Sequence, residues 1–146
     1  MTDRFETFTF LINKIKRNIS RLKAEEMSEF SLKSSHVNCI YYLSRYDSLT
    51  ATELTELCSE DKAAISRSLA HLDDCGLVSY KESTNRKKYN TPIVLTEQGR
   101  TVAERLSKSI SKVLEESSAG LDEESRKIMY EGLEIISKNL EKISII

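Results

Sequence analysis

Residues 60–78, EDKAAISRSLAHLDDCGLV, carry two kinds of side chain at helical spacing. Ile65, Leu69 and Leu72 form an apolar stripe, which predicts a helix with one face on a core. The other face mixes small residues with cations, where a solvated helix usually carries pairs of glutamate and lysine. Its positions are Lys62, Ala63, Ala64, Ser66, Arg67, Ala70 and His71.

The chemistry open to this second face is contact with a nucleic-acid groove. Two successive alanines would let the backbone approach closely and touch a thymine methyl, and Ser66 could hydrogen-bond a base or a phosphate. Lys62 and Arg67 could reach phosphate or guanine. An alanine-rich face on an isolated helix is more often inert surface, so this prediction depends on the neighbouring elements.

A basic segment follows the expected helix. Residues 81–89 have a net charge of +3 and include Arg86, Lys87 and Lys88, whereas residues 115–134 have a net charge of -5. The whole chain is nearly neutral, at -1, so the basic segment predicts a local anion-binding surface rather than a generally basic protein. A solvated hairpin with several lysines would give the same pattern.

Metal and catalytic chemistry have little support. His36 and Cys39 are three residues apart and His71 and Cys75 four apart, but no further ligand cluster accompanies either pair, so we expect no metal and no cofactor. The sequence contains no phosphate-binding loop, dinucleotide-binding glycine pattern or GxSxG motif, so we expect no enzyme. The sequence has three cysteines, Cys39, Cys58 and Cys75. An odd number without CxxC spacing fits reduced thiols in the cytoplasm.

Length and composition predict one mainly α-helical domain spanning residues 1–146. The chain has 146 residues, 31% of them charged, with four glycines and one proline, which disfavours strand-rich folds. No apolar run approaches the roughly 18 residues of a membrane span, and the first ten residues do not resemble a signal peptide. We therefore expect a soluble cytoplasmic protein without a membrane partner.

Long amphipathic helices are expected at both ends of the chain. Apolar residues recur every three or four positions in three stretches. The stretches are Phe5, Phe8, Ile12, Ile15, Ile19 and Leu22; Ala103, Leu106, Ile110 and Val113; and Met129, Leu133, Ile136, Leu140 and Ile143. Packing into a bundle within one chain is the commoner fate of such stripes, but the apolar C-terminal tail favours a two-fold interface.

The middle of the chain is divided into shorter elements. Ser34 or Ser35 is expected to cap a helix that ends near Tyr46, and Thr50 to cap a short helix that ends near Cys58. Residues 59–61 form a turn and a new N-cap, and Gly76 ends the helix that follows. Residues 77–81 and 92–95 then read as two strands joined by the basic segment. Helix, turn, helix and hairpin in this order predict a helix-turn-helix with a wing.

Residues 49–99 resemble the winged-helix core of MarR-family transcriptional regulators. The shared features are a leucine-threonine start, the recognition-helix pattern DKAAISR, the pattern LAHLDDCGLV and the sequence LTEQG after the wing. Many family wings carry an aspartate before the arginine, where this chain has Asn85.

The resemblance implies a homodimer on a pseudo-palindromic operator in double-stranded DNA. Residues 1–25 and 100–146 would form the dimerisation bundle, and residues 33–99 the winged helix-turn-helix lobe with its short β-hairpin wing. The implied contacts are Lys62, Ala63, Ala64, Ser66, Arg67 and His71 from the recognition helix and Arg86, Lys87 and Lys88 from the wing.

The resemblance also implies that a repressor of this kind responds to a small molecule or to oxidation. Cys75, at the end of the recognition helix, is the candidate redox switch, and Phe30, His36, Tyr41 and Tyr42 are candidates to line an effector pocket. A different class stays open at this point: a winged-helix interaction module that holds an acidic protein partner.

Overall fold

The computed structural model describes residues 3–81 and 90–143. The described chain forms two compact units, one ending at Ser109 and the other beginning at Ile110, so the boundary lies within one long helix. The predicted single-domain organisation stays a prediction. No helix in the described ranges is long and apolar enough to span a membrane.

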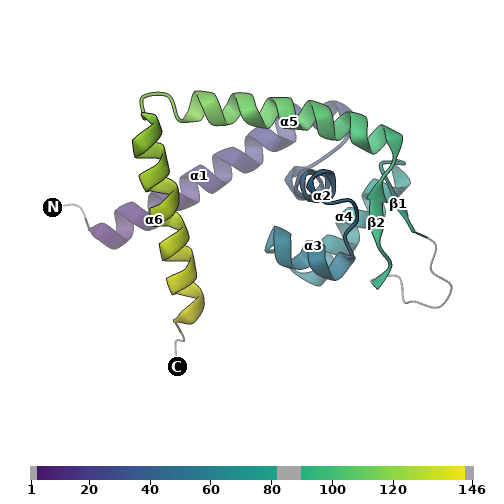
Figure 1. Cartoon of the computed structure of the whole chain (residues 1–146), viewed down its shortest axis with the longest axis horizontal. Helices are drawn as coiled ribbons and strands as arrows, with labels where there is room; N and C mark the ends of the chain where they lie inside the picture. The colour runs from purple at the N-terminus through teal and green to yellow at the C-terminus, as the bar shows by residue number, and fades with distance from the viewer. Residues whose placement is uncertain (1–2, 82–89, 144–146) are drawn as a thin grey trace. The chain divides into compact units, whose positions relative to one another are not determined.

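The elements follow the order expected from the sequence (Figure 1). They are α1 (Arg4–Glu26), the 3-10 helix η1 (Ser28–Phe30), α2 (Ser34–Arg45), α3 (Ala51–Cys58), α4 (Lys62–Asp74), β1 (Val78–Tyr80), β2 (Ile93–Leu95), α5 (Glu97–Ser117) and α6 (Glu123–Lys142). The prediction of a mainly α-helical winged helix-turn-helix with long helices at both ends is confirmed.

Side-chain caps define several helix starts, among them those of α3, α4 and α6. Thr50 Oγ1 accepts the Glu53 N–H at 3.2 Å, Asp61 Oδ1 the Ala64 N–H at 2.7 Å, and Asp122 Oδ1 the Ser125 N–H at 2.7 Å. These bonds satisfy amides that a first helical turn leaves without partners. The first two were predicted from the sequence and are confirmed.

The predicted cap of α2 is wrong. The helix begins one residue earlier than a Ser34 cap would allow, and Lys33 is its N-cap residue without a side-chain cap bond. The Lys33 N–H instead donates to His36 Nδ1 at 3.0 Å. An imidazole nitrogen therefore closes this helix start, a role that serine was expected to take.

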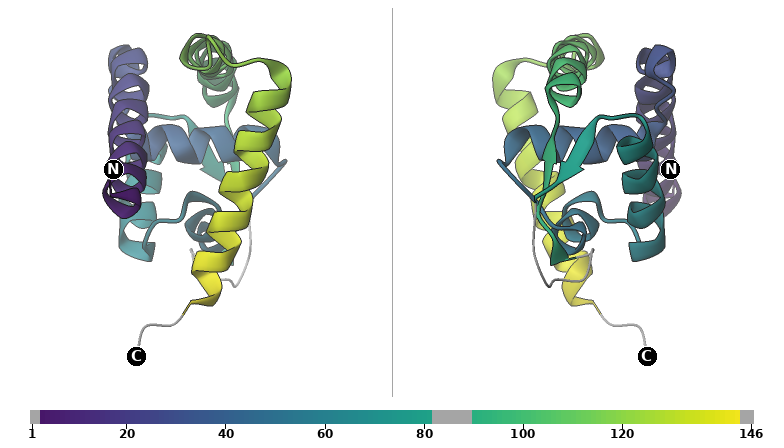
Figure 2. Two further views of the ribbon diagram at one scale, coloured as in Figure 1. Left: turned by 90° about the vertical axis from the view of Figure 1, so that its left-hand side faces the viewer. Right: turned by 90° about the vertical axis from the view of Figure 1, so that its right-hand side faces the viewer.

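The core of the first unit lies around α2. This helix contacts α1, α3, α4 and β2, and α4 also packs on β1, as the side views show (Figure 2). Ile40, Leu54, Ile65, Leu72 and Ile93, from four different elements, are fully buried. The apolar stripe of residues 60–78 is thus the core face of α4.

The hairpin is held to the helices by a short series of polar bonds. β1 and β2 pair antiparallel, with Val78 opposite Leu95, and Leu49 adds a bridge to Ile93. Thr96 Oγ1 donates to the Gly76 carbonyl at 2.6 Å and accepts the Gly99 N–H at 3.1 Å. These bonds tie the end of α4 to the start of α5.

Gly99 is required by close packing. A Cβ atom at this position would collide with the Leu77 backbone oxygen. The helix start therefore approaches the backbone before β1 more closely than any side chain allows. This contact explains the glycine of the LTEQG sequence in structural terms.

The long helices leave apolar faces uncovered within the described chain. On α1, Phe5 is 75% exposed and Ile15 53% exposed; on α6, Leu140 is 59% exposed and Leu133 39% exposed. Neither helix contains a buried residue. Both stripes predicted at the chain ends therefore lie on exposed helices.

Candidate nucleic-acid interface

The start of α4 presents an exposed face of small and cationic side chains. Asp61 caps the helix, and the buried residues Ile65, Ser68, Leu69 and Leu72 fix which side faces the core. Lys62, Ala63, Ser66, Arg67 and Ala70 are exposed, and Ala64 is half-buried. The helical spacing read from the sequence therefore separates the two faces correctly.

This face has the physical properties that a groove requires. Its alanines add little bulk over the backbone, and the hydroxyl and the two cations supply hydrogen-bond donors. The helix start also has amide groups and the positive end of the helix dipole, which favour a phosphate. Assignment of these residues to DNA contacts stays a prediction.

His71 differs from the other predicted contacts. Its ring stacks on His36, with centroids 4.3 Å apart and planes 15° from parallel, and its Nε2 lies 2.9 Å from the Ser31 carbonyl oxygen. Ser31 has a left-handed backbone conformation, with φ of 59°. The side chain of His71 therefore connects α4 to the segment before α2. Sequence reasoning missed this contact because Ser31 lies forty residues earlier.

His36 occupies a site that favours its neutral form. Burial lowers the pKa of His36 from its ordinary value, and the neighbouring His71 and Lys33 act in the same direction. Neutral His36 can accept the Lys33 N–H at Nδ1, whereas a protonated ring cannot. Protonation of His36 would therefore remove the hydrogen bond from Lys33 that closes the start of α2.

The two histidine and cysteine pairs, at which no metal was expected, differ in the exposure of their cysteines. Cys39 is fully buried, and the exposed Cys75 has its Sγ 3.6 Å from His71 Nε2. Residues 3–81 and 90–143 contain no group of three or more histidine, cysteine or acidic residues arranged to hold a metal ion. The suggestion that Cys75 is a redox switch stays a prediction.

The base of the wing is described, whereas its basic tip is not. β1 ends at Tyr80, and the Lys81 N–H donates to the Pro92 carbonyl at 2.8 Å, which extends the pairing by one step. Lys81 is exposed. Arg86, Lys87 and Lys88 lie outside the described residues, so their predicted roles stay predictions.

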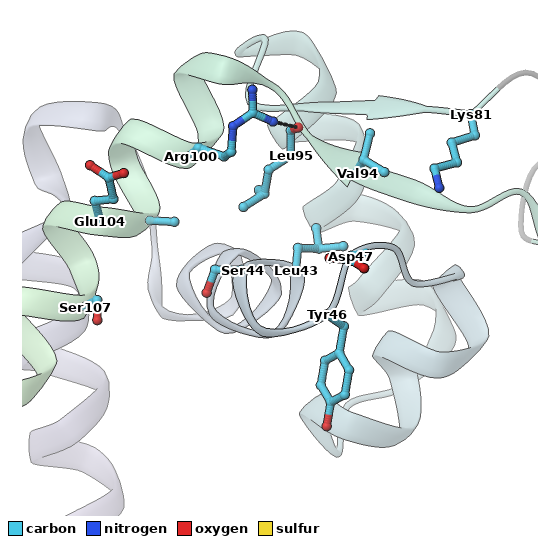
Figure 3. A pocket seen from close by; sticks show the side chains of 11 residues that line it. Leu43, Ser44, Tyr46, Asp47, Lys81, Val94, Leu95, Arg100, Glu104 and Ser107 are labelled. Atoms are coloured by element: carbon cyan, nitrogen blue, oxygen red, sulfur yellow. Dashed lines mark hydrogen bonds between the residues drawn. The ribbon is translucent and has the colours of Figure 1, made fainter.

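A pocket of about 700 Å³ lies between the end of α2, the hairpin and the first turns of α5 (Figure 3). Its lining residues are Leu43, Ser44, Tyr46, Asp47, Lys81, Val94, Leu95, Arg100, Ala103, Glu104 and Ser107. Arg100 donates through Nη1 to the Leu95 carbonyl at 3.1 Å, which fixes the guanidinium against the strand. The pocket therefore combines apolar walls with charged groups of both signs.

None of the four residues predicted for an effector pocket lines this one. Phe30 lies beneath the Arg105 guanidinium at 5.4 Å, and Tyr41 packs edge to face on Tyr42 at 5.2 Å. His36 stacks on His71. Sequence reasoning missed Lys81 and Arg100 because the pocket joins segments far apart in the chain. The available signal was a cationic residue close to each of the two expected strands.

The fold is that of a winged-helix protein, and comparison with known proteins identifies it as a DNA-binding domain. Residues 36–114 match the model of the winged helix DNA-binding domain. An uncharacterized HTH-type transcriptional regulator of Bacillus cereus is 30% identical over 124 residues, which cover 84% of this chain and 82% of the relative.

Solved structures have the same fold. A MarR transcriptional regulator from Methanosarcina mazei superposes with a TM-score of 0.84 at 22% identity, covering 99% of this chain and 95% of the other. Staphylococcus aureus MarR, solved in complex with salicylate and kanamycin, superposes with a TM-score of 0.83 at 14% identity, covering 95% and 93%.

The chain belongs to the family of winged-helix, HTH-type DNA-binding transcriptional regulators, and its fold is that of the MarR regulators. The resemblance seen in residues 49–99 is thereby confirmed. The relatives are regulators rather than enzymes, in agreement with the absence of catalytic motifs.

Proposed function

We propose that this regulator acts as a homodimer that recognises a pseudo-palindromic operator in double-stranded DNA and represses transcription in the cytoplasm. The observation that carries the proposal is the exposed face of α4, where small residues and two cations stand opposite a fully buried apolar stripe. A helix of this kind can enter the major groove, which is about 12 Å wide.

The proposed contacts divide by chemistry. Ser66 and Arg67 would read base edges or bind phosphate, Ala63 and Ala64 would allow close approach, and Lys62 would bind phosphate at the helix start. Few of these groups form directional bonds to bases, so DNA shape would carry much of the sequence preference. His71 would act mainly by positioning α4, through Ser31.

The wing would supply affinity with little sequence preference. Arg86, Lys87 and Lys88 would lie along the phosphate backbone or place an arginine in a minor groove. Exposed Lys81 at the base of the hairpin carries the same charge.

The proposal of a dimer rests on the uncovered apolar faces. Monomeric proteins rarely leave contiguous apolar surface of this extent in water. α1 and α6 each carry a run of exposed aromatic or aliphatic residues, and a two-fold axis would cover both runs with the same residues of a second copy.

A small effector would bind in the pocket beside the wing. The pocket is of the size that small molecules occupy and joins the hairpin to α2 and α5, so an occupant could change how the hairpin is held. Staphylococcus aureus MarR holds small molecules in its solved complex, which supports a ligand-responsive regulator here.

Fluorescence anisotropy on labelled duplexes tests the proposal. We expect one selected operator to bind at least about a thousandfold more tightly than a random duplex of equal length at moderate salt. Equal affinity for both duplexes would contradict the proposal. Binding of an acidic protein in place of DNA would support the interaction module, which family membership does not favour.

A further inference from the structure

His71 attaches α4 to the segment that precedes α2. Its Nε2 lies 2.9 Å from the Ser31 carbonyl oxygen. Because a carbonyl oxygen only accepts hydrogen bonds, Nε2 carries a proton and donates it to this bond. His71 lies about one helical turn after Arg67 on α4. The bond to Ser31 therefore helps to fix the part of α4 that carries the proposed DNA contacts.

Ser31 belongs to a segment that is anchored in the core. Its backbone is left-handed, with φ of 59°, and its N–H donates to the Ser28 carbonyl at 3.0 Å. The Leu32 N–H donates to the Met27 carbonyl at 3.3 Å, and the side chains of both residues are buried. The Ser31 carbonyl is thus a fixed point, and His71 connects α4 to it.

His36 supports the His71 ring from α2. The two rings are stacked, with centroids 4.3 Å apart and planes 15° from parallel. His36 is 9% exposed, and its Nδ1 accepts the Lys33 N–H at 3.0 Å. Each ring is therefore held by one bond to the backbone and by contact with the other ring.

Protonation acts against this arrangement in two ways. A proton on Nδ1 of His36 would point at the Lys33 N–H, so that two donors would lie 3.0 Å apart without an acceptor between them. Two charged rings would also repel each other across the stack. The observed packing of His36 on His71 therefore requires a neutral His36.

The charged and titratable neighbours of the two rings come from the start of α2 and from α4. Burial lowers the pKa of His36, and the His71 ring and the Lys33 ammonium act in the same direction. The Cys75 thiol lies 3.6 Å from His71 Nε2. None of these neighbours is a carboxylate that would stabilise added positive charge.

We propose that His36 and His71 are positioning residues for α4 and that protonation of this pair weakens operator recognition at acidic pH. When His36 takes up a proton from solvent, it loses the bond from Lys33 and the stack separates. His71 then loses its support, and α4 is held less firmly to the anchored segment. This inference rests on the proposed operator binding and assigns a regulation to the same helix.

Operator preference measured against pH tests the proposal on the full chain. Anisotropy gives the affinities for the selected duplex and for a random duplex between about pH 7.5 and 5.5, the range where histidine changes its charge. Added positive charge strengthens binding to both duplexes, so the ratio of the two affinities reports the position of α4. We expect this ratio to fall at least about tenfold, since one linked proton changes affinity up to about tenfold per pH unit. A ratio that stays constant would overturn the proposal.

Variants that do not titrate separate positioning from packing. The side chain in His36→Asn keeps an acceptor and that in His71→Gln keeps a donor, whereas His71→Leu keeps neither. His36→Asn should retain most of its operator preference on acidification. His71→Leu should lower the preference already at neutral pH, and His71→Gln should restore part of it. Cys75→Ser is the matched control and should follow the wild-type pH profile.

Two results with these variants would contradict the assigned roles. A wild-type pH profile in His36→Asn would exclude His36 as the group that responds to protons. Equal operator preference in His71→Leu and His71→Gln would exclude the bond to Ser31 as the means of positioning α4.

A titration followed by NMR tests the pair without DNA. The chain has only two histidines, so each variant identifies the ring signal of the other. We expect His36 to titrate at higher pH in His71→Gln than in the wild type, because the neighbouring ring lowers the pKa of His36. An unchanged curve would show that the rings do not interact and would overturn the proposal.

The two proposals fail in different ways. Absence of any sequence preference at neutral pH would contradict the proposed function, and the NMR titration would then still test the pair. A clear preference that persists unchanged on acidification would overturn this inference alone.

Discussion

The winged lobe and the terminal helices share one sequence pattern, an apolar stripe at helical spacing. The stripe is buried in the lobe and exposed on the terminal helices. In α2 and α4 the apolar stripe is buried within the chain, as at Ile40 and Ile65. In α1 and α6 stripes of similar spacing stay exposed, as at Ile15 and Leu133. Helical periodicity thus predicts that a face seeks a partner, but not whether the partner belongs to the same chain.

The largest effect is expected from charging the exposed stripe of α6. Leu133→Asp combined with Ile136→Asp places two carboxylates where a second copy would pack, and burying them unpaired is costly. We expect a monomer by analytical ultracentrifugation and a loss of operator affinity on the order of a thousandfold, because one half-site alone approaches non-specific binding.

Ser137→Asp provides the matched control, since residue 137 is an exposed polar position on the same helix. The control should stay dimeric and bind normally. Circular dichroism should show equal helix content for both variants. If the doubly charged variant stayed dimeric, the exposed stripe of α6 would not be the surface that packs on a second copy.

Two glycines allow the lobe and α6 to be compared by their effect on the free energy of unfolding. At Gly99, in the lobe, an added Cβ collides with the Leu77 oxygen, whereas at Gly132, on α6, an added Cβ meets nothing within 4 Å. Gly99→Ala should lower the free energy of unfolding by roughly 2–4 kcal/mol, as backbone displacement in a packed site does. Gly132→Ala should raise it by roughly 0.5–1 kcal/mol, through helix propensity. Urea unfolding measures both, and equal effects would contradict the assigned packing.

The cations of the lobe should act on DNA binding without affecting folding. Arg67→Ala should weaken operator binding by roughly 1–3 kcal/mol and change the preferred sequence if the guanidinium contacts a base. Arg86→Ala with Lys88→Ala should weaken binding to all duplexes and lower the slope of affinity against salt by about two. Anisotropy titrations between 50 and 200 mM salt, about the range where this slope is usually resolved, separate the two behaviours. Identical salt slopes would argue against phosphate contacts by the wing.

The smallest effect concerns the stacked histidines. Because the pKa of His36 is lowered in the folded protein, the unfolded chain binds more protons below the ordinary pKa of 6.5. This contribution to stability is fully present above pH 6.5 and decreases as the pH falls from there towards the folded pKa. Urea midpoints should therefore fall on acidification, and less so after His36→Asn. An unchanged pH dependence in that variant would contradict the assignment.

Local sequence features predicted the lobe well. Thr50, Asp61 and Gly76 each act within a few residues of their own position, as caps or as a left-handed residue, so their effect is visible in the sequence. The outward face of α4 follows from the same local periodicity. At the start of α2 the expected serine cap is absent, and the Lys33 N–H donates to a ring nitrogen of His36 instead. Sequence patterns for helix caps do not include an imidazole acceptor.

Contacts between distant segments could not be predicted. The contact of His71 with Ser31 and the pocket beside Arg100 each require the tertiary fold. The sequence contained the chemical groups but not their partners. The four residues expected in an effector pocket do not line the pocket beside Arg100, since aromatic type alone does not define a cavity.

Selection of bound duplexes from a random pool tests the central claim most directly. We expect enriched sites with two inverted half-sites whose centres lie about one helical turn, 10–10.5 base pairs, or a multiple of it apart, bound by two chains per site. The absence of enrichment, or enrichment of a single half-site bound by one chain, would contradict a dimeric regulator that reads DNA through α4.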